Sequence, residues 1–553
     1  MSIVRRFRQE WLTLILLCLA AFFVNNSLLP VGGGEAKVLV TARDIVDGGN
    51  WLAPTMNGEP RYDKPPLASW VAALVQSIHA DNISAQRTVA GLLGIVWTMF
   101  FFGITRYFSR RRGFAEIATV VFITTYNIIY MGRMVERDIY GYAFMMVAIY
   151  FMMRMFFDSQ YFANPHKWRW AWLAGLAMGL SLLGNGLVAV YSMLMPWLVA
   201  IVLFKRPDMT GRWGPLLLLV VLAILPYGMW LWYIQIYHPE AAPESWGFLP
   251  ARWTEKATRP WYYYWRFFAE MGIWSLILLA ALLFPFWKKR IRTRRVYRFA
   301  LAWLANGLVI LASTPHKEMV DLVALTPPCA IAVTCVLYYY EECWPKEKVT
   351  QRFFLFNGYL IALIMFGLPI FMLIRMFGRD LIDFGTAIFL WVLLWGIAMY
   401  TALSTKRHSP KGVVRGVALL FFFIECFMLT PIVGVLGNNR KVSINQVSKV
   451  SELKQLPFYY NQDEELKIEV VYEVGKKVSP ININDPDAVS KATPFALITQ
   501  QPLAKEMNAD VLSRVDTLRV GVYDDNTLPR HNQHYKKEFI NQVSIVKKKQ
   551  AQQ

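Results

Sequence analysis

The chain has little of what most soluble enzymes use for chemistry. It contains five cysteines in 553 residues, and their spacing fits no metal motif, which argues against disulfides and against a cysteine-based metal site. It has no Gly-rich phosphate loop, so no nucleotide site is expected. Charged residues form 17% of the chain and hydrophobic residues 56%. This balance is typical of a polytopic membrane protein and not of a soluble domain.

Acidic residues are also scarce, with 38 Asp and Glu against 58 Lys and Arg, for a formal charge of +20. The basic residues form short clusters between apolar runs, for example at residues 5–8, 110–112 and 288–298. Cytoplasmic loops of membrane proteins carry such clusters. We interpret the charge as membrane topology, with no nucleic-acid partner. The alternation of clusters predicts a cytoplasmic N-terminus and an external C-terminus.

The apolar runs predict about thirteen transmembrane helices, since one span needs about 20 apolar residues. We interpret residues 1–24 as a retained first span and not as a cleaved signal peptide, because no small-residue cleavage site follows. The predicted transmembrane domain covers residues 1–437. The predicted spans are centred near residues 20, 95, 122, 148, 177, 195, 224, 278, 304, 332, 364, 392 and 424.

The first external loop, at about residues 30–84, predicts two amphipathic helices. Apolar residues recur at helical spacing within residues 35–47, and Gly48 and Gly49 end that pattern. A second apolar stripe follows Pro65 and Pro66, which suit the first turn of a helix. We expect both helices to lie in the membrane interface plane.

The last part of the chain, residues 438–553, changes composition sharply and predicts a small soluble α+β domain on the periplasmic side. Strand-like alternation occurs at residues 467–474, 495–500, 518–523 and 543–547, and a helical pattern at residues 502–515. The segment contains no nucleophile motif, phosphate loop or metal cluster. Acceptor docking and stability are both open as its role.

Several motifs occur in a defined order. An acidic residue follows the first span, and then come TARDIVDGGNWLAP at residues 41–54, YDKPPL at residues 62–67, and Arg137 with Asp138 after the third span. RPWYYYW at residues 259–265 and STPHK at residues 313–317 come later. Together they resemble the GT-C membrane glycosyltransferases that use polyprenyl-phosphate sugars. Within that group the chain is similar to the lipid A aminoarabinose transferases and the protein O-mannosyltransferases.

The resemblance implies roles for individual residues. The family's acidic residue before the Lys-Pro pair falls on Asp63, and its lipid-phosphate lysine falls on Lys64. The Asp-Glu pair that opens the loop in the family is Gly34 and Glu35 here, so one expected carboxylate is missing. A second departure is Asp321 with Ala324, where many relatives have a tyrosine and a proline.

Elementary chemistry asks for the same residue types. Displacing a polyprenyl phosphate from a sugar leaves a phosphate anion and places positive charge on the ring, so the site needs cations and carboxylates. The predicted catalytic residues are Glu35, Asp63 and Asp138. The residues predicted to bind the lipid phosphate and sugar are Lys37, Arg61, Tyr62, Lys64, Arg259, Tyr262, His316 and Lys317. No metal site is indicated and no cofactor is required.

Each residue also has a structural interpretation. Asp63 could cap the helix after it, and Lys64 could extend towards the lipid headgroups. Asp138 could pair with Arg137 or Arg133 at a helix start. Glu35 could be a solvated loop residue, and the aromatic residues at 261–265 could form an interfacial belt.

The sequence therefore predicts an inverting glycosyltransferase of the bacterial inner membrane. It would move one sugar from a polyprenyl (undecaprenyl) phosphate to a lipid A or lipopolysaccharide, glycan or protein acceptor on the periplasmic face, among membrane lipids. Two alternatives are a flippase for lipid-linked sugars and a ligase or polymerase that uses diphosphate-linked glycans. A flippase would place ionisable residues at mid-depth in several spans.

Overall fold

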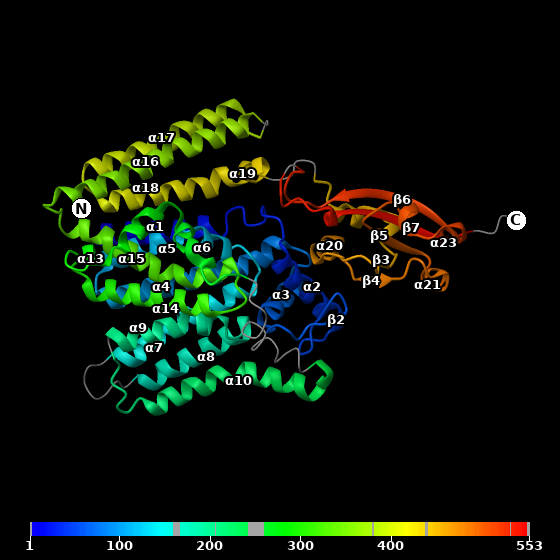
Figure 1. Cartoon of the computed structure of the whole chain (residues 1–553), viewed down its shortest axis with the longest axis horizontal. Helices are drawn as coiled ribbons and strands as arrows, with labels where there is room; N and C mark the ends of the chain where they lie inside the picture. The colour runs from blue at the N-terminus through cyan, green and yellow to red at the C-terminus, as the bar shows by residue number, and fades with distance from the viewer. Residues whose placement is uncertain are drawn as a thin grey trace. The chain divides into compact units, whose positions relative to one another are not determined.

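The structure is a computed structural model that describes residues 3–158, 166–204, 206–241, 259–378, 381–436, 441–530 and 532–549. The chain divides into two compact units (Figure 1). The helical unit comprises Met1–Asn26, Tyr62–Ala68 and Ser84–Pro431, and the mixed unit comprises Ser27–Arg61, Ser69–Ile83 and Ile432–Gln553. Most of the first loop therefore packs with the C-terminal part. The predicted boundary at 437/438 lies outside the described residues.

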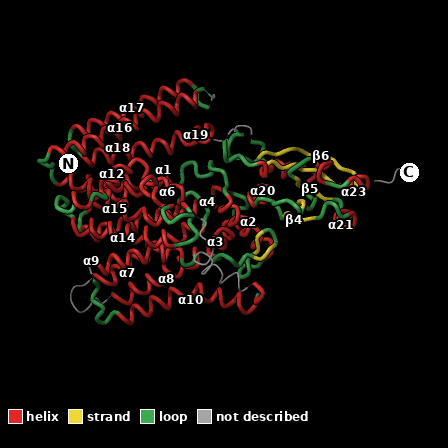
Figure 2. The backbone as a smooth tube through the Cα atoms, in the orientation of Figure 1, coloured by secondary structure: helices red, strands yellow, loops and turns green. Residues whose placement is uncertain are grey.

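The helical unit is built from long apolar helices (Figure 2). Its elements are α1 (Ile3–Phe22), α4 (Ile83–Ser109), α5 (Arg112–Ile123), α6 (Tyr126–Met131), α7 (Arg137–Phe157), α8 (Lys167–Asn185), η1 (Val190–Leu194), α9 (Met195–Phe204), α10 (Trp213–Tyr237), η2 (Pro239–Ala241), η3 (Tyr263–Trp274), α12 (Ser275–Ala281), α13 (Phe284–Trp287), α14 (Arg294–Ser313), η4 (Met319–Leu325), α15 (Thr326–Glu342), α16 (Lys348–Phe377), α17 (Phe384–Lys406), α18 (Pro410–Phe423), η5 (Ile424–Met428) and the start of α19 (Leu429–Leu436).

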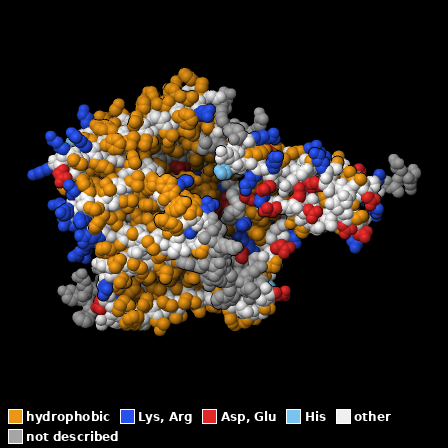
Figure 3. Space-filling model, in the orientation of Figure 1, with side chains coloured by type: hydrophobic (Ala, Val, Ile, Leu, Met, Phe, Trp, Pro, Cys, Tyr) orange, Lys and Arg blue, Asp and Glu red, His pale blue; other side chains and the backbone are white. Residues whose placement is uncertain are grey.

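Eight helical segments in the described part of the chain are long and apolar enough to cross a membrane. Three shorter apolar helices are Leu12–Phe22, Leu67–Ile78 and Val190–Phe204. The fold is therefore that of a helical polytopic membrane protein, as predicted, while the count of thirteen spans stays a prediction. Hydrophobic side chains cover much of the visible surface of the helical unit, and Lys and Arg side chains gather at its left end (Figure 3). The orientation of the termini across the membrane stays a prediction.

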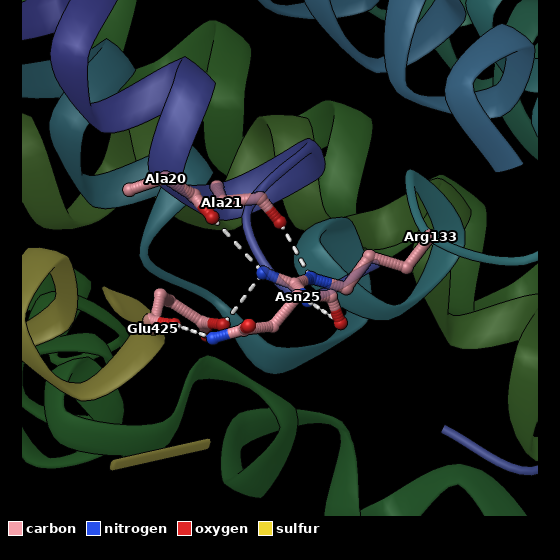
Figure 4. Close-up of polar contacts among 5 residues, drawn as sticks. All are labelled: Ala20, Ala21, Asn25, Arg133 and Glu425. Carbon is pink, nitrogen blue, oxygen red and sulfur yellow. Dashed lines mark hydrogen bonds and ion pairs between the residues drawn. The ribbon is translucent and has the colours of Figure 1, made fainter. Parts of the chain in front are cut away.

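A buried polar cluster lies at the C-terminal end of α1 and binds its last carbonyl groups (Figure 4). Arg133 is 1% exposed, and its Nε donates to the Ala21 carbonyl at 2.6 Å while its Nη2 donates to the Ala20 carbonyl at 2.9 Å. The same Nη2 lies 2.7 Å from Oε2 of Glu425 in η5. Asn25 Nδ2 donates to the Glu425 carbonyl at 3.1 Å. Arg133 therefore satisfies carbonyl groups that the end of a helix leaves without partners.

The mixed unit joins the loop helices to a five-stranded sheet in the order β4-β3-β5-β7-β6. Strand β3 runs parallel to β4 and β5, and β7 runs antiparallel to β5 and β6. Val40 of the loop shares one hydrophobic core with Val470, Val474 and Ile498. The elements are α2 (Gly33–Gly48), β1 (Thr55–Met56), β2 (Glu59–Pro60), most of α3 (Leu67–Ile78), η6 (Ile444–Lys449), η7 (Ser451–Leu453), β3 (Phe458–Asn461), α20 (Ile468–Val474), β4 (Val478–Ile481), α21 (Pro486–Ala492), β5 (Phe495–Thr499), α22 (Leu503–Glu506), α23 (Ala509–Arg514), β6 (Val515–Asp524), η8 (Lys537–Phe539) and β7 (Ile540–Lys548).

Both loop helices form where the sequence predicts them. Helix α2 ends at Gly48, and the next residue, Gly49, has a φ of 68°, the left-handed conformation that glycine adopts readily. Leu39, Ala42 and Ile45 are buried, as their spacing predicted, whereas Val46 is exposed. Their placement in a membrane interface stays a prediction.

The secondary structure of the C-terminal part was predicted only in part. The strands predicted at residues 495–500, 518–523 and 543–547 correspond to β5, β6 and β7. The strand predicted at residues 467–474 is wrong, because this segment forms α20 and buries Val470, Val471 and Val474 on one helical face. The single helix predicted at residues 502–515 is two short helices, α22 and α23, separated by extended backbone at Met507.

Candidate functional site

The predicted site residues are divided between the two units. Glu35, Lys37 and Arg61 belong to the mixed unit. Asp63, Lys64, Asp138 and the residues predicted at 259–262 and 316–317 belong to the helical unit, as does Tyr62. Each group is described within its own unit.

In the mixed unit, Glu35 lies in the first turn of α2 and is fully buried. This excludes its interpretation as a solvated loop residue. Lys37, two residues later, is exposed. Arg61 Nη1 donates to the Lys37 carbonyl and to Thr41 Oγ1, the latter at 2.6 Å. The guanidinium of Arg61 therefore links the residues after β2 to α2. Its contact with substrate stays a prediction.

The residues of the resemblance motif between Asp44 and Gly58 organise the loop. Asp44 Oδ2 accepts hydrogen bonds from Thr55 Oγ1 at 3.0 Å and from the Gly58 amide at 2.8 Å. The Asn57 side chain donates to the Val478 carbonyl at 2.7 Å and accepts from the Val478 amide at 2.8 Å. These contacts shape the β1–β2 turn and join it to β4, so this part of the motif has a structural function.

In the helical unit, Tyr62, Asp63 and Lys64 lie side by side in the chain but differ in exposure. Tyr62 is 4% exposed, and its ring centroid lies 5.2 Å from that of His238. Burial, with a smaller effect from Tyr233, raises the pKa of Tyr62. Lys64 Nζ lies 3.6 Å from Asp63 Oδ2, with side-chain exposures of 30% and 51%. A residue that caps a helix directly precedes it. Asp63 lies four residues before the start of α3, so it does not cap this helix.

Asp138 lies in the first turn of α7, where the helix dipole favours a negative charge. Asn185, the last residue of α8, is 1% exposed, and its Nδ2 donates to Asp138 Oδ1 at 2.6 Å. Asn185 was missed at the sequence level. An asparagine at the end of an apolar run gives no signal of its partner, because that partner lies 47 positions away in the chain.

The two late motifs meet in the helical unit. Lys317 is 5% exposed, and its Nζ donates to the Thr314 carbonyl and to the Arg259 carbonyl, the latter at 3.5 Å. The Arg259 guanidinium lies 4.6 Å from the centroid of the Tyr263 ring. His316 Nε2 lies 3.0 Å from Glu318 Oε1. The Lys317 ammonium therefore contacts the backbone of Arg259, and phosphate binding by these residues stays a prediction.

Two aromatic residues that follow Arg259 in the chain have exposed side chains. Tyr262 is 56% exposed and Trp261 75% exposed, which fits both a substrate contact and an interfacial belt. Among the residues that the structure describes, no group of three or more His, Cys, Asp or Glu side chains could hold a metal ion.

In chemical terms, the helical unit holds cations that can bind an anion and two carboxylates, Asp63 and Asp138, that can stabilise positive charge. Its fold and motifs resemble the GT-C glycosyltransferases that use lipid-linked sugars.

Residues 63–230 match the family model described as dolichyl-phosphate-mannose-protein mannosyltransferase. The match begins at Asp63 and includes Asp138.

Individual proteins are also similar to the chain in sequence. Three proteins described as undecaprenyl phosphate-alpha-4-amino-4-deoxy-L-arabinose arabinosyl transferases are similar to the chain. The Shewanella sediminis protein is 24% identical over 340 residues, which cover 56% of this chain and 57% of that protein. The Serratia proteamaculans protein is 22% identical, with 63% and 64% covered, and the Pseudomonas fluorescens protein is 25% identical, with 61% and 59% covered. The alignments thus span less than two thirds of these relatives.

The fold is also similar over the whole chain to a solved structure. The crystal structure of ArnT from Cupriavidus metallidurans bound to undecaprenyl phosphate matches with a TM-score of 0.65 at 14% identity. The match covers 99% of this chain and 98% of that one. The resemblance predicted from the sequence motifs is therefore confirmed.

Proposed function

We propose that this protein is a glycosyltransferase that moves a single sugar from a polyprenyl phosphate, such as undecaprenyl phosphate, to an envelope acceptor. The supporting observation is the partly exposed pair of Lys64 and Asp63, which opens the range that matches the mannosyltransferase family model. The names of the similar arabinosyl transferases support an undecaprenyl-phosphate donor. We place the reaction at the periplasmic face of the bacterial inner membrane, with the N-terminus in the cytoplasm.

In this proposal the bond between the anomeric carbon and the phosphate oxygen breaks, and its electron pair stays on the phosphate. Lys64 binds that phosphate, because an ammonium group stabilises the negative charge that develops on it. Arg259 and Lys317 are further cations for the carrier, and His316 is a further group that contacts its phosphate. The acceptor oxygen forms the new bond on the opposite face of the ring, which inverts the anomeric centre.

The carboxylates act on the sugar and the acceptor. Asp63 and Asp138 stabilise the positive charge that develops on the ring, and one of them accepts the proton of an acceptor hydroxyl. An acceptor that is already an ionised phosphate needs no base. Tyr62 and Tyr262 complete the proposed site in the helical unit. The predicted roles of Glu35 in catalysis and of Lys37 and Arg61 in substrate binding, all three in the mixed unit, stay separate predictions. The acceptor is lipid A or lipopolysaccharide, a glycan or a protein hydroxyl.

The test uses the full chain, purified and reconstituted in lipid nanodiscs. Undecaprenyl phosphate linked to 4-amino-4-deoxy-L-arabinose is offered first, and other undecaprenyl-phosphate sugars follow, each with lipid A, an envelope glycan fraction or a protein acceptor. We expect Lys64→Ala and Asp63→Ala each to lower the transfer rate by about 100-fold or more, as loss of one transition-state contact does. Lys449→Ala, which removes an exposed lysine in η6, is the matched control.

Full activity of both variants would contradict the site assignment. Movement of a fluorescent lipid-linked sugar across liposomes without any acceptor would instead indicate a flippase. Accumulation of a diphosphate carrier in a deletion strain would indicate a ligase or polymerase. Mass spectrometry of envelope glycolipids with and without the gene identifies the acceptor.

A further inference from the structure

The hydrogen bond between Asn185 and Asp138 is a partly buried polar contact between α7 and α8 that the sequence did not reveal. Asn185 is 1% exposed and donates to Asp138 Oδ1 at 2.6 Å, a short distance for an amide and a carboxylate. A buried amide group without a partner would destabilise the fold, so this contact fixes both side chains.

Small residues bring the two helices close enough for this contact. A Cβ added at Gly141 of α7 would lie 2.6 Å from the Cβ of Asn185, and one added at Gly184 of α8 would lie 2.7 Å from the Cβ of Tyr140. Real Cβ atoms do not approach so closely, so both glycines are needed at this crossing. Ser181 Oγ also donates to the Gly141 carbonyl at 2.7 Å, one helical turn before Asn185.

We propose that Asn185 is a positioning residue for the reaction: it orients the Asp138 carboxylate towards the sugar through this hydrogen bond. The inference rests on the proposed function and adds a residue to its site. Asn185 donates from a neutral amide, so it constrains one carboxylate oxygen without neutralising the charge. A hydrogen-bond partner that does not itself touch the substrate can hold the group that does in its working orientation.

The experiment measures kcat and donor KM for sugar transfer, together with the melting temperature, on the full chain in nanodiscs. The donor is the undecaprenyl-phosphate sugar that supports turnover in the wild-type protein. For Asn185→Ala we expect kcat to fall about 10- to 100-fold, with donor KM changed by less than about twofold. Ser181→Ala is the matched control, since it removes a buried bond of the same helix pair without touching Asp138, and we expect its kcat to stay near the wild-type value.

Two further variants separate positioning from simple stability. In an Asp138→Asn background, Asn185→Ala should lower kcat no further, because the two residues act through one contact. The exchange variant, Asp138→Asn with Asn185→Asp, keeps an amide opposite a carboxylate. It should therefore regain most of the melting temperature lost in Asn185→Ala but keep the low kcat of Asp138→Asn.

The outcomes are distinct. If Asn185→Ala and Ser181→Ala lower kcat equally, or if the effects of Asn185→Ala and Asp138→Asn are additive, the positioning role is refuted. Should Asn185→Ala fail to fold, Asn185→Ser takes its place in the same comparison. Full activity of Asp138→Asn would refute the inference as well, whereas absence of transfer by the wild-type protein with every donor would count against the proposed function itself.

Discussion

The buried ion pair of Arg133 and Glu425 makes a sharp prediction about stability. The two side chains are 2% and 10% exposed and lie 2.7 Å apart (Figure 4). Glu425→Ala leaves the Arg133 guanidinium buried without its countercharge, although the carbonyls of Ala20 and Ala21 still accept its hydrogen bonds. Removing one partner of a buried ion pair costs about 3–5 kcal/mol of folding free energy. We expect the same range for Glu425→Ala.

The helical unit also supplies a matched control. Arg290 and Glu347 lie 2.7 Å apart as well, but their side chains are 27% and 56% exposed. Exposed ion pairs contribute about 0–1 kcal/mol, because water screens the charges. Glu347→Ala should therefore lower the free energy of unfolding by no more than that.

The assay is denaturant unfolding of the detergent-solubilised full chain, followed by the fluorescence of its tryptophans. The double variant Arg133→Met with Glu425→Leu removes both charges, and we expect it to be more stable than Glu425→Ala. Its recovery should be partial, because the carbonyl groups at the end of α1 lose their donor. Equal losses for Glu425→Ala and Glu347→Ala would refute the reasoning.

Two further predictions concern the mixed unit. Burial and the neighbouring Glu506 raise the pKa of Glu464 to about 7; the folded state then binds more protons than the unfolded state between about pH 4.5 and 7, so stability falls as pH rises through this window. Glu464→Gln should flatten that dependence in unfolding measurements from pH 4 to 8, and an unchanged slope would contradict it. Gly58→Ala should lower the melting temperature, because φ is 84° there and alanine adopts this left-handed conformation only with strain. Gly48→Ala, with open space around it and no such φ, should not.

Local sequence patterns predicted several helices and strands of the mixed unit. The loop helix α2 and the strands β5, β6 and β7 were predicted near their observed places. Residues 467–474 were not, because alternating apolar residues in so short a segment also fit one helical face. Strands β3 and β4 are four residues each and gave no separate signal.

At the site, the sequence could nominate ionisable residues but not their contacts. Asp63, Lys64 and Asp138 follow from residue type, motif order and position after a span. The partners of buried polar groups depend on tertiary packing instead. Arg133 and Glu425 are 292 positions apart, and only the meeting of the α1 end with η5 places them together. A single sequence holds no record of such a pairing.

Asp321 shows how a departure from a family pattern can be integrated into the fold. It is 1% exposed, and its Oδ2 accepts hydrogen bonds from the Tyr264 hydroxyl at 2.7 Å and from the Glu318 amide at 3.0 Å. Asp321 therefore links the segment at residues 313–321 to the segment at residues 259–265, which contains Tyr264. The hydrogen bond from Lys317 to the Arg259 carbonyl joins the same two segments. Both segments carry residues predicted to bind phosphate, so the Asp321 carboxylate, which replaces the expected tyrosine, has a structural role that needs no contact with substrate.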